Sequence, residues 1–219
     1  MALQLYFHPF SSYCQKVLIP LYDNGIPFES RIVEGPDSPA GRELAERWPM
    51  KRFPMLVDGD RTVMEATCIV EYLDLVHPGP ARMIPADPAE ALETRFMDRF
   101  FDNYIATPVQ QIVFNEMRPE AARDPYGVRN WRGMLDTAYA WLDRKMADRT
   151  WAAGDRFSLA DCGAAPHLFY ADWTHPIPAA CGNVRAYRAR LLEHPSFARA
   201  VDDARPYRAW FPLGAPDRD

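Results

Sequence analysis

The chain has 219 residues, of which 48% are hydrophobic, so it can bury a large core in one domain or two. Its formal net charge of −5 disfavours a nucleic-acid partner. No apolar run in the sequence approaches the ~20 residues that a membrane-spanning helix needs, so we expect a cytoplasmic protein without a membrane partner.

The first third of the chain alternates short strands and helices. A helix is expected where Val17, Leu18 and Leu21 recur at helical spacing, and Pro20 should kink or shorten it. The signal Asp-Gly-Asp at residues 58–60 predicts a hairpin. The expected strands are residues 3–7, 28–33, 55–57 and 62–64, and the expected helices are residues 12–24, 41–48 and 66–76. Their order is βαβ followed by αββα.

A proline-rich linker precedes a part of the chain that is helical throughout. The expected helices are residues 90–117 with a bend at Pro108, 126–146, 159–173 with Pro166 inside, 182–192 and 196–204. The tail, residues 206–219, is rich in proline and aromatic residues, and we expect its charged end to be mobile. We therefore divide the chain into a domain at 1–77, a linker at 78–88 and a helical domain at 89–219.

Two segments indicate chemistry with a thiol. Residues 10–17, Phe-Ser-Ser-Tyr-Cys-Gln-Lys-Val, have the form of a glutaredoxin-type Cys-Pro-Tyr-Cys-x-Lys-Val element in which Ser11 replaces the attacking cysteine. Residues 52–59, Arg-Phe-Pro-Met-Leu-Val-Asp-Gly, place Pro54 immediately before a strand. Together the segments suggest a thioredoxin-like fold that no longer exchanges disulfides but holds the thiol of another molecule, with glutathione the first candidate.

With two further motifs, Glu-Ala-Thr-Cys-Ile-Val-Glu-Tyr-Leu at 65–73 and Phe-Ser-Leu-Ala-Asp at 157–161, the chain resembles a cytosolic glutathione transferase of the bacterial, serine-using kind, similar to the theta and zeta classes. The resemblance extends over nearly the whole length. It implies a thioredoxin-like α/β domain with a mixed four-stranded sheet, an all-helical domain, a homodimer, and glutathione as co-substrate. It implies no metal, in line with four cysteines and five histidines that are dispersed without ligand spacing.

Ser11, or its neighbour Ser12, is the candidate for activating the thiol. A helix start carries unpaired N–H groups and about half a positive charge, which stabilise a thiolate. One hydroxyl donor adds a charge-assisted hydrogen bond of roughly 1.5–3 kcal/mol, which lowers a thiol pKa by roughly one to two units. The alternative is that Ser11 or Ser12 only caps the helix.

Two other side chains compete for contact with the sulfur. Tyr6, at the end of the first strand, resembles the tyrosine that other classes of the family use for this purpose, although it can also be an ordinary strand aromatic. Cys14 stands at the resolving position of a glutaredoxin, three residues after Ser11, and can form a mixed disulfide with glutathione or serve as a small buried apolar residue.

The resemblance also implies the residues that hold the rest of glutathione. The Phe53–Pro54 bond is cis in the family, and the backbone of Phe53 pairs with the cysteinyl unit like an added strand. Glu65 and the helix start at Ala66 hold the γ-glutamyl end, although the family usually has Ser or Thr at the position of Ala66. Lys51 and Arg52 are candidates for the glycyl carboxylate or ordinary surface charges.

The second substrate, a hydrophobic electrophile, is expected between the two domains. The candidate lining residues, each of which can equally belong to the core, are Phe10, Tyr104, Val109, Gln110, Phe114, Trp210 and Phe211. Ser158 and Asp161 form a capping box variant that we interpret as folding machinery.

Three alternatives to a transferase remain open. The first is a glutathione-dependent cis-trans isomerase of the zeta kind, although Tyr13 stands where that class has the cysteine of its Ser-Ser-Cys run. The second is a thiol oxidoreductase that uses Cys14. The third is a non-catalytic binding protein with the same fold, which the loss of a hydroxyl at Ala66 favours.

Overall fold

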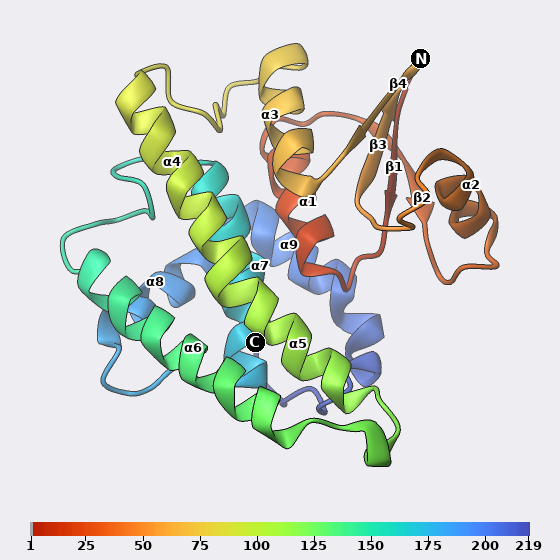
Figure 1. Cartoon of the computed structure of the whole chain (residues 1–219). Coiled ribbons are helices and arrows are strands. Elements are labelled where there is room, and N and C mark those ends of the chain that lie inside the picture. Colours follow the sequence, from red (N-terminus) through yellow and green to blue (C-terminus); the bar gives the residue numbers. More distant parts are fainter. Residues whose placement is uncertain (1) are drawn as a thin grey trace.

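The computed structural model describes residues 2–219. Its first domain is built on one mixed sheet in the order β2-β1-β3-β4 (Figure 1). The strands are β1 (Leu3–Phe7), β2 (Phe28–Ile32), β3 (Met55–Asp58) and β4 (Arg61–Met64). β1 runs parallel to β2 and antiparallel to β3, and β3 and β4 form the predicted hairpin. The mixed four-stranded sheet of the predicted thioredoxin-like fold is confirmed.

Alternation along β1 divides the domain into two layers, because neighbouring strand residues point to opposite faces. Leu3, Leu5 and Phe7 join the main core with helices α1 (Ser12–Asp23) and α3 (Ala66–Val76). Tyr6 belongs to a smaller cluster on the other face, which helix α2 (Pro39–Arg47) covers. Figure 1 shows α2 standing apart from α1 and α3, with the sheet between them.

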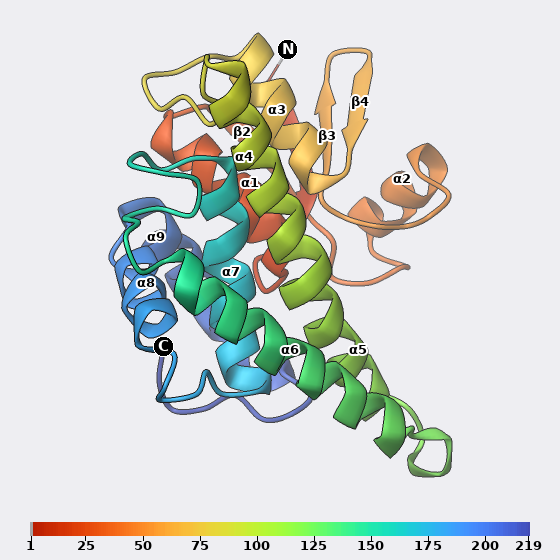
Figure 2. The ribbon, with the colours of Figure 1, turned by 60° about the vertical axis from the view of Figure 1, so that its left-hand side comes forward.

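The second domain is helical, as predicted. Its elements are α4 (Pro88–Phe100), a π-helical segment η1 (Phe101–Ala106), α5 (Thr107–Glu116), the 3₁₀ turn η2 (Glu120–Ala122), α6 (Pro125–Lys145), α7 (Leu159–Thr174), α8 (Gly182–Leu192), α9 (Pro195–Ala204) and the 3₁₀ segment η3 (Arg205–Trp210). In Figures 1 and 2, α4 and α5 form one long rod that lies alongside α6, and α7 is enclosed by the other helices.

The long helix predicted at 90–117 is interrupted in a way that the sequence did not indicate. The irregularity lies before Pro108, in the π-helical turn, where the amide of Thr107 bonds the carbonyl of Asp102 five residues back. Pro108 has no amide hydrogen and its ring displaces the carbonyl four residues earlier, so a wider turn accommodates it without ending the helix. Pro20 and Pro166 likewise lie inside continuous helices.

The main core is continuous from the sheet into the helical domain. α1 packs against α7 and α9, and nearly every residue of α7 is buried. The two domains therefore share one core, and the first turns of α1 and α3 lie against α4 and η1.

The charged end of the tail forms ion pairs. Asp219 pairs with Arg205 and Arg208, and Arg218 forms an ion pair of 2.6 Å with Asp172 of α7.

Candidate functional site

Ser11 occupies the N-cap of α1, in the extended conformation that a capping residue adopts. Its Oγ accepts a hydrogen bond from the amide of Cys14 at 3.4 Å, and its own amide donates to the carbonyl of His8 at 3.0 Å. The hydroxyl of Ser11 also lies against the thiol of Cys14, where a side-chain hydrogen bond acts on the pKa of that thiol. Ser12 is the first residue of the helix and, within residues 2–219, its side chain forms no hydrogen bond. Both serines are partly exposed at the positive end of α1.

The loop before β3 presents a free stretch of backbone. The Phe53–Pro54 bond is cis, as expected. Within the described chain, neither the amide nor the carbonyl of Phe53 forms a hydrogen bond, so both are available to an extended ligand. Lys51 has a positive φ of 54°, and Lys51 and Arg52 are exposed at this loop.

The start of α3 is the second free helix end. Glu65 takes the N-cap position with φ 67° and ψ 121°, and no side chain caps the helix. A left-handed φ in a residue other than glycine costs of order 1–3 kcal/mol and is concentrated at functional sites. The first helical bond runs from Ile69 to the carbonyl of Glu65, which leaves the amides of Ala66, Thr67 and Cys68 without partners in the described chain.

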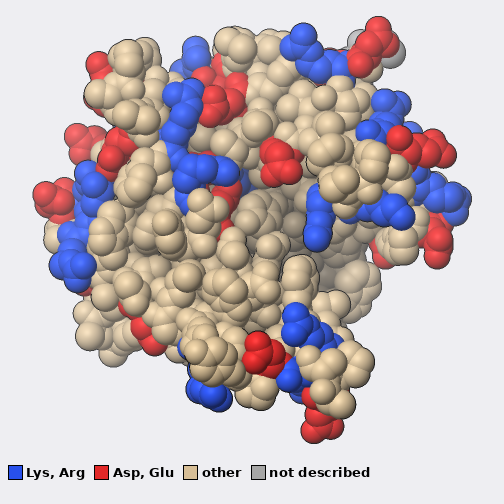
Figure 3. Space-filling model, in the orientation of Figure 1, with Lys and Arg blue, Asp and Glu red and all other residues tan. Residues whose placement is uncertain are grey.

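Figure 3 shows the surface hollowed where the starts of α1 and α3 meet α4. Basic side chains over α4 stand beside the hollow, and an acidic side chain lies over the start of α3. This depression therefore lies between the domains, at the starts of α1 and α3.

A buried ionic cluster ties α1 to the helical domain beneath this depression. Lys16 is fully buried, with Nζ 2.5 Å from Asp98 and 3.0 Å from Asp102, and it donates to Thr67 Oγ1 at 2.9 Å. His167 Nε2 lies 3.0 Å from the same Asp102. One lysine thereby connects α1, α3, α4 and η1.

Arg99 closes the cluster on the solvent side. Its guanidinium contacts Asp98 at 2.7 Å, Asp102 at 2.5 Å and the hydroxyl of Thr67. Burial raises the pKa of Asp102, but the hydrogen bond from His167 and the charge of Lys16 outweigh it and hold the pKa of this carboxyl below its usual value. Burial lowers the pKa of His167.

Tyr13, in the first turn of α1, lies over this cluster. Its ring centroid is 4.8 Å from that of His167, and burial followed by the charge of Asp102 raises its pKa. The charges of Arg99 and Glu65 also act on it, so Tyr13 lies between the cluster and the start of α3.

The structure places Tyr6 and Cys14 in surroundings that do not suit the roles considered for them. Tyr6 is 1% exposed in the cluster beneath α2, and its hydroxyl donates to Glu43 at 2.7 Å. Cys14 is completely buried, and burial raises the pKa of its thiol to about 12. A thiol that is neither ionised nor accessible cannot act as a redox nucleophile.

The candidate residues for the second substrate form two groups. Phe10 packs edge-on against Tyr170 and Phe211, and Trp210 stacks on His8. The other group lies on the long helical rod: Tyr104 on η1 beside Phe100, with Gln110 and Phe114 further along α5 and Val109 buried. No aromatic contact in the described chain joins the two groups.

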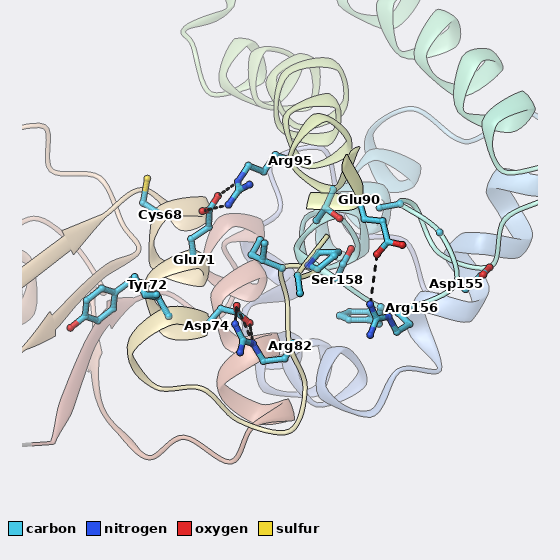
Figure 4. A pocket seen from close by; sticks show the side chains of 18 of the residues that line it. Cys68, Glu71, Tyr72, Asp74, Arg82, Glu90, Arg95, Asp155, Arg156 and Ser158 are labelled. Atoms are coloured by element: carbon cyan, nitrogen blue, oxygen red, sulfur yellow. Dashed lines mark hydrogen bonds and ion pairs between the residues drawn. The ribbon is translucent and has the colours of Figure 1, made fainter. Parts of the chain in front are cut away.

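A cavity of about 1040 Å³ lies elsewhere, between α3, the linker, α4 and residues 153–158. None of the predicted site residues lines it. Figure 4 shows that its charged side chains pair with each other: Glu71 with Arg95, Asp74 with Arg82, and Glu90 with Arg156. Because Ser11, Phe53 and Glu65 do not line it, this cavity is a groove between helices and not the thiol site.

Sequence reasoning missed Arg99, His167 and the two aspartates of the cluster. They lie on helices whose periodic pattern predicts only burial, and nothing near them in sequence indicates that Lys16 meets them. Lys16 and Tyr13 both lie within the motif at residues 10–17. A lysine on the apolar face of that helix was the sequence feature that could have indicated a buried ionic cluster.

Residues 5–81 match the family model for the N-terminal domain of glutathione S-transferases, and residues 120–190 match that for the C-terminal domain. The two matches together cover more than half of the chain. The chain therefore belongs to the glutathione S-transferase family.

Three relatives illustrate the range of this family. The structure of a glutathione S-transferase from Methylobacterium radiotolerans, in complex with glutathione sulfonate, is 30% identical with a TM-score of 0.80, over 92% of this chain and 95% of that chain. A probable maleylacetoacetate isomerase from Vibrio cholerae is 26% identical over 94% of this chain and 98% of the relative. FtsZ-localized protein A from Caulobacter vibrioides is 26% identical over 80% of this chain and 79% of the relative.

Residues 2–219 contain neither a membrane-spanning helix nor a metal-binding cluster. No helix there is both long and apolar enough to cross a bilayer. No group of three or more His, Cys, Asp or Glu side chains there is arranged to hold a metal ion.

Proposed function

We propose that this protein is a glutathione transferase of the serine-using kind. Glutathione binds along the free backbone of Phe53 with its γ-glutamyl end at the start of α3, and Ser11 donates a hydrogen bond to its sulfur. The thiolate then attacks an electrophilic carbon of a hydrophobic substrate, forming a carbon–sulfur bond. Where the electrophile carries a leaving group, that group departs with the electron pair.

The observation that carries this proposal is the position of Ser11, whose partly exposed hydroxyl stands at the N-cap of α1. A hydroxyl at the positive end of a helix stabilises a thiolate without a general base. The co-crystallised glutathione sulfonate of the Methylobacterium relative supports a glutathione site on this fold. Lys51 and Arg52 would meet the glycyl carboxylate, and Ser12 stays the second candidate for the sulfur.

The decisive experiment is the ultraviolet absorbance of the thiolate of bound glutathione against pH, in wild type and in Ser11→Ala. We expect the wild type to lower the thiol pKa by roughly one to two units and the variant to lose that shift. The rate with a model electrophile at neutral pH should then fall roughly ten- to a hundredfold. Ser12→Ala tests the second candidate: if Ser12 holds the sulfur, this variant and not Ser11→Ala should lose the shift. An unshifted thiol in the wild type would contradict the proposal.

An isomerase of the zeta kind is the second candidate, because the Vibrio relative carries that name. Such a reaction uses the same thiolate: it adds to a conjugated double bond, rotation follows, and the thiolate leaves unchanged. Conversion of a cis-configured conjugated dicarboxylic acid to its trans isomer, without consumption of glutathione, would favour it over transfer.

We further propose that the protein is a cytoplasmic homodimer. Exposed apolar residues lie on both domains beside the large groove: Leu75 on α3, and Leu92 and Phe96 one turn apart on α4. A two-fold axis would place α3 of one subunit against α4 of the other. The exposed apolar residues of each subunit would then be buried against the same residues of its partner. This arrangement also matches the expected contact between unlike domains.

A further inference from the structure

Two arginines one turn apart on α4, Arg95 and Arg99, contact α3. They differ in which nitrogens of the guanidinium group remain without a hydrogen-bond partner. Arg95 donates two hydrogen bonds to Glu71, at 2.8 and 2.9 Å, from Nε and Nη2. One carboxylate thus occupies one edge of its guanidinium group. Arg99 reaches Thr67, in the first turn of α3. All hydrogen bonds of Arg99 within residues 2–219 leave from Nε and Nη2. Its Nη1 is therefore unoccupied, on a side chain that is 49% exposed.

The carboxylates that hold Arg99 do not outnumber the cations of the cluster. Asp98 and Asp102 each contact both Arg99 and the buried Lys16, so two cations face two carboxylates. The carboxylates fix the guanidinium in position without leaving a net negative charge to repel an anion. The positive end of α3 adds to the attraction.

The start of α3 offers free amides but no side-chain hydroxyl. Ala66 has none, and the hydroxyl of Thr67 is already in contact with Lys16, Asp98 and Arg99. If a carboxylate binds these amides through one oxygen, no side chain of α3 is available to donate a hydrogen bond to its second oxygen. Arg99 is the cation held against that same turn.

We propose that Arg99, from the helical domain, donates through Nη1 to the α-carboxylate of the γ-glutamyl unit of glutathione and so replaces the hydroxyl that Ala66 cannot supply. This inference rests on the proposed function. It makes the γ-glutamyl site a bridge between the domains, with amides from α3 on one side of the carboxylate and a guanidinium from α4 on the other. Arg99 is a binding residue and does not touch the sulfur.

The test is a calorimetric titration of wild type, Arg99→Gln and the matched control Arg95→Gln with two ligands. One ligand is glutathione, and the other is the analogue in which 4-aminobutyrate replaces the γ-glutamyl residue, which lacks only the α-carboxylate. Loss of one charged hydrogen bond should weaken glutathione binding to Arg99→Gln roughly ten- to a hundredfold. Binding of the analogue should be the same in all three proteins, and Arg95→Gln should bind glutathione like the wild type.

A second readout separates binding from activation. The thiol pKa of glutathione bound to Arg99→Gln should equal that in the wild type, whereas Ser11→Ala should change it. If Arg99→Gln does not fold, Arg99→Lys is the alternative, because it keeps the charge beside Asp98 and Asp102 but lacks the planar guanidinium group. This variant should bind glutathione severalfold more weakly than the wild type and should bind the analogue equally well.

Equal losses for both ligands, or wild-type affinity in Arg99→Gln, would overturn the role of Arg99 while leaving the proposed function standing. Failure of the wild type to bind glutathione at millimolar concentration would overturn both.

Discussion

At the scale of single residues, the free donors of the site lie where the backbone leaves its regular path. Ser11 ends the extended segment after β1, Phe53 precedes the cis proline, and Glu65 adopts a left-handed φ before α3. At each of these positions, a hydrogen-bonding group that would be paired within a regular helix or strand stays available to a ligand. Tyr6 and Cys14 were the alternatives to Ser11 for contact with the sulfur. Both side chains are instead buried in the core.

The four cysteines should differ sharply in reactivity. Cys68 is exposed on α3, whereas Cys14, Cys162 and Cys181 are buried, and burial raises the pKa of each buried thiol. We expect one thiol of the native protein to react quickly with a chromogenic disulfide reagent at pH 8, and Cys68→Ser to abolish that phase. Rapid labelling of Cys14 would restore the oxidoreductase alternative.

At the scale of elements, helix starts serve two different purposes in this fold. The start of α7 is closed: Asp161 accepts bonds from the amides of Ala152 at 2.8 Å and Ser158 at 2.9 Å and from the hydroxyl of Tyr187 at 2.6 Å. The start of α3 has no such cap, and Ser11 caps α1 with its oxygen only. Closed ends stabilise the fold, and open ends provide donors for a ligand.

Asp161→Ala should therefore destabilise the protein by about 2–4 kcal/mol, because several buried donors lose their acceptor at once. The measurement is the free energy of unfolding from urea denaturation. Asp87→Ala is the matched control: Asp87 caps α4 at the surface and accepts only from Ala89 and Glu90, so its loss should cost about 1 kcal/mol. Equal costs for the two variants would refute the role of burial.

At the scale of the whole molecule, the ionic cluster joins the two domains in a shared core. Lys16 comes from α1, Asp98 and Arg99 from α4, Asp102 from η1 and His167 from α7. A buried ion pair whose partners are all present is tolerated, but removal of one partner leaves an uncompensated charge. The cluster therefore fixes how the domains sit on each other and keeps the first turn of α1 beside the start of α3.

The cluster also predicts loss of stability in acid. Burial lowers the pKa of His167, so the folded protein keeps it neutral, while the unfolded chain binds a proton as pH falls through about 6.5. Stability should then fall below that pH by up to about 1.4 kcal/mol per unit, and the lowered pKa of Asp102 adds a loss below about pH 4.

Urea unfolding between pH 5 and 7.5 would measure this slope in wild type and in His167→Gln. Burial lowers the pKa of His8 and His194 as well, so the difference between the two slopes is the diagnostic quantity. A variant with the wild-type slope would show that His167 does not contribute.

The proposed homodimer makes a separate prediction at this scale. Light scattering should give a mass of twice 25.1 kDa for the wild type and one chain mass for the Leu92→Arg, Phe96→Arg double variant. Met117→Arg is the control, because Met117 is equally exposed but lies at the far end of α5. A monomeric wild type would contradict the proposal.

The sequence by itself determined the local features of this protein. The strands, most helices, the hairpin at Gly59, the capping box at Ser158 and the serine at the start of α1 all depend on residues close together in the chain, where periodicity and turn chemistry apply. The motifs around Ser11, Pro54, Glu65 and Asp161, taken together, were sufficient for the family.

Only the tertiary structure decided which side chains meet across long separations. It placed Tyr6 under α2, buried Cys14, and joined Lys16 to Asp102, 86 positions along the chain, and Asp102 to His167, a further 65 positions along. Such contacts depend on how helices of different domains pack, and a helical pattern specifies a buried face without naming its partner. For the same reason Arg99 could be recognised only after α4 was seen to lie against the start of α3.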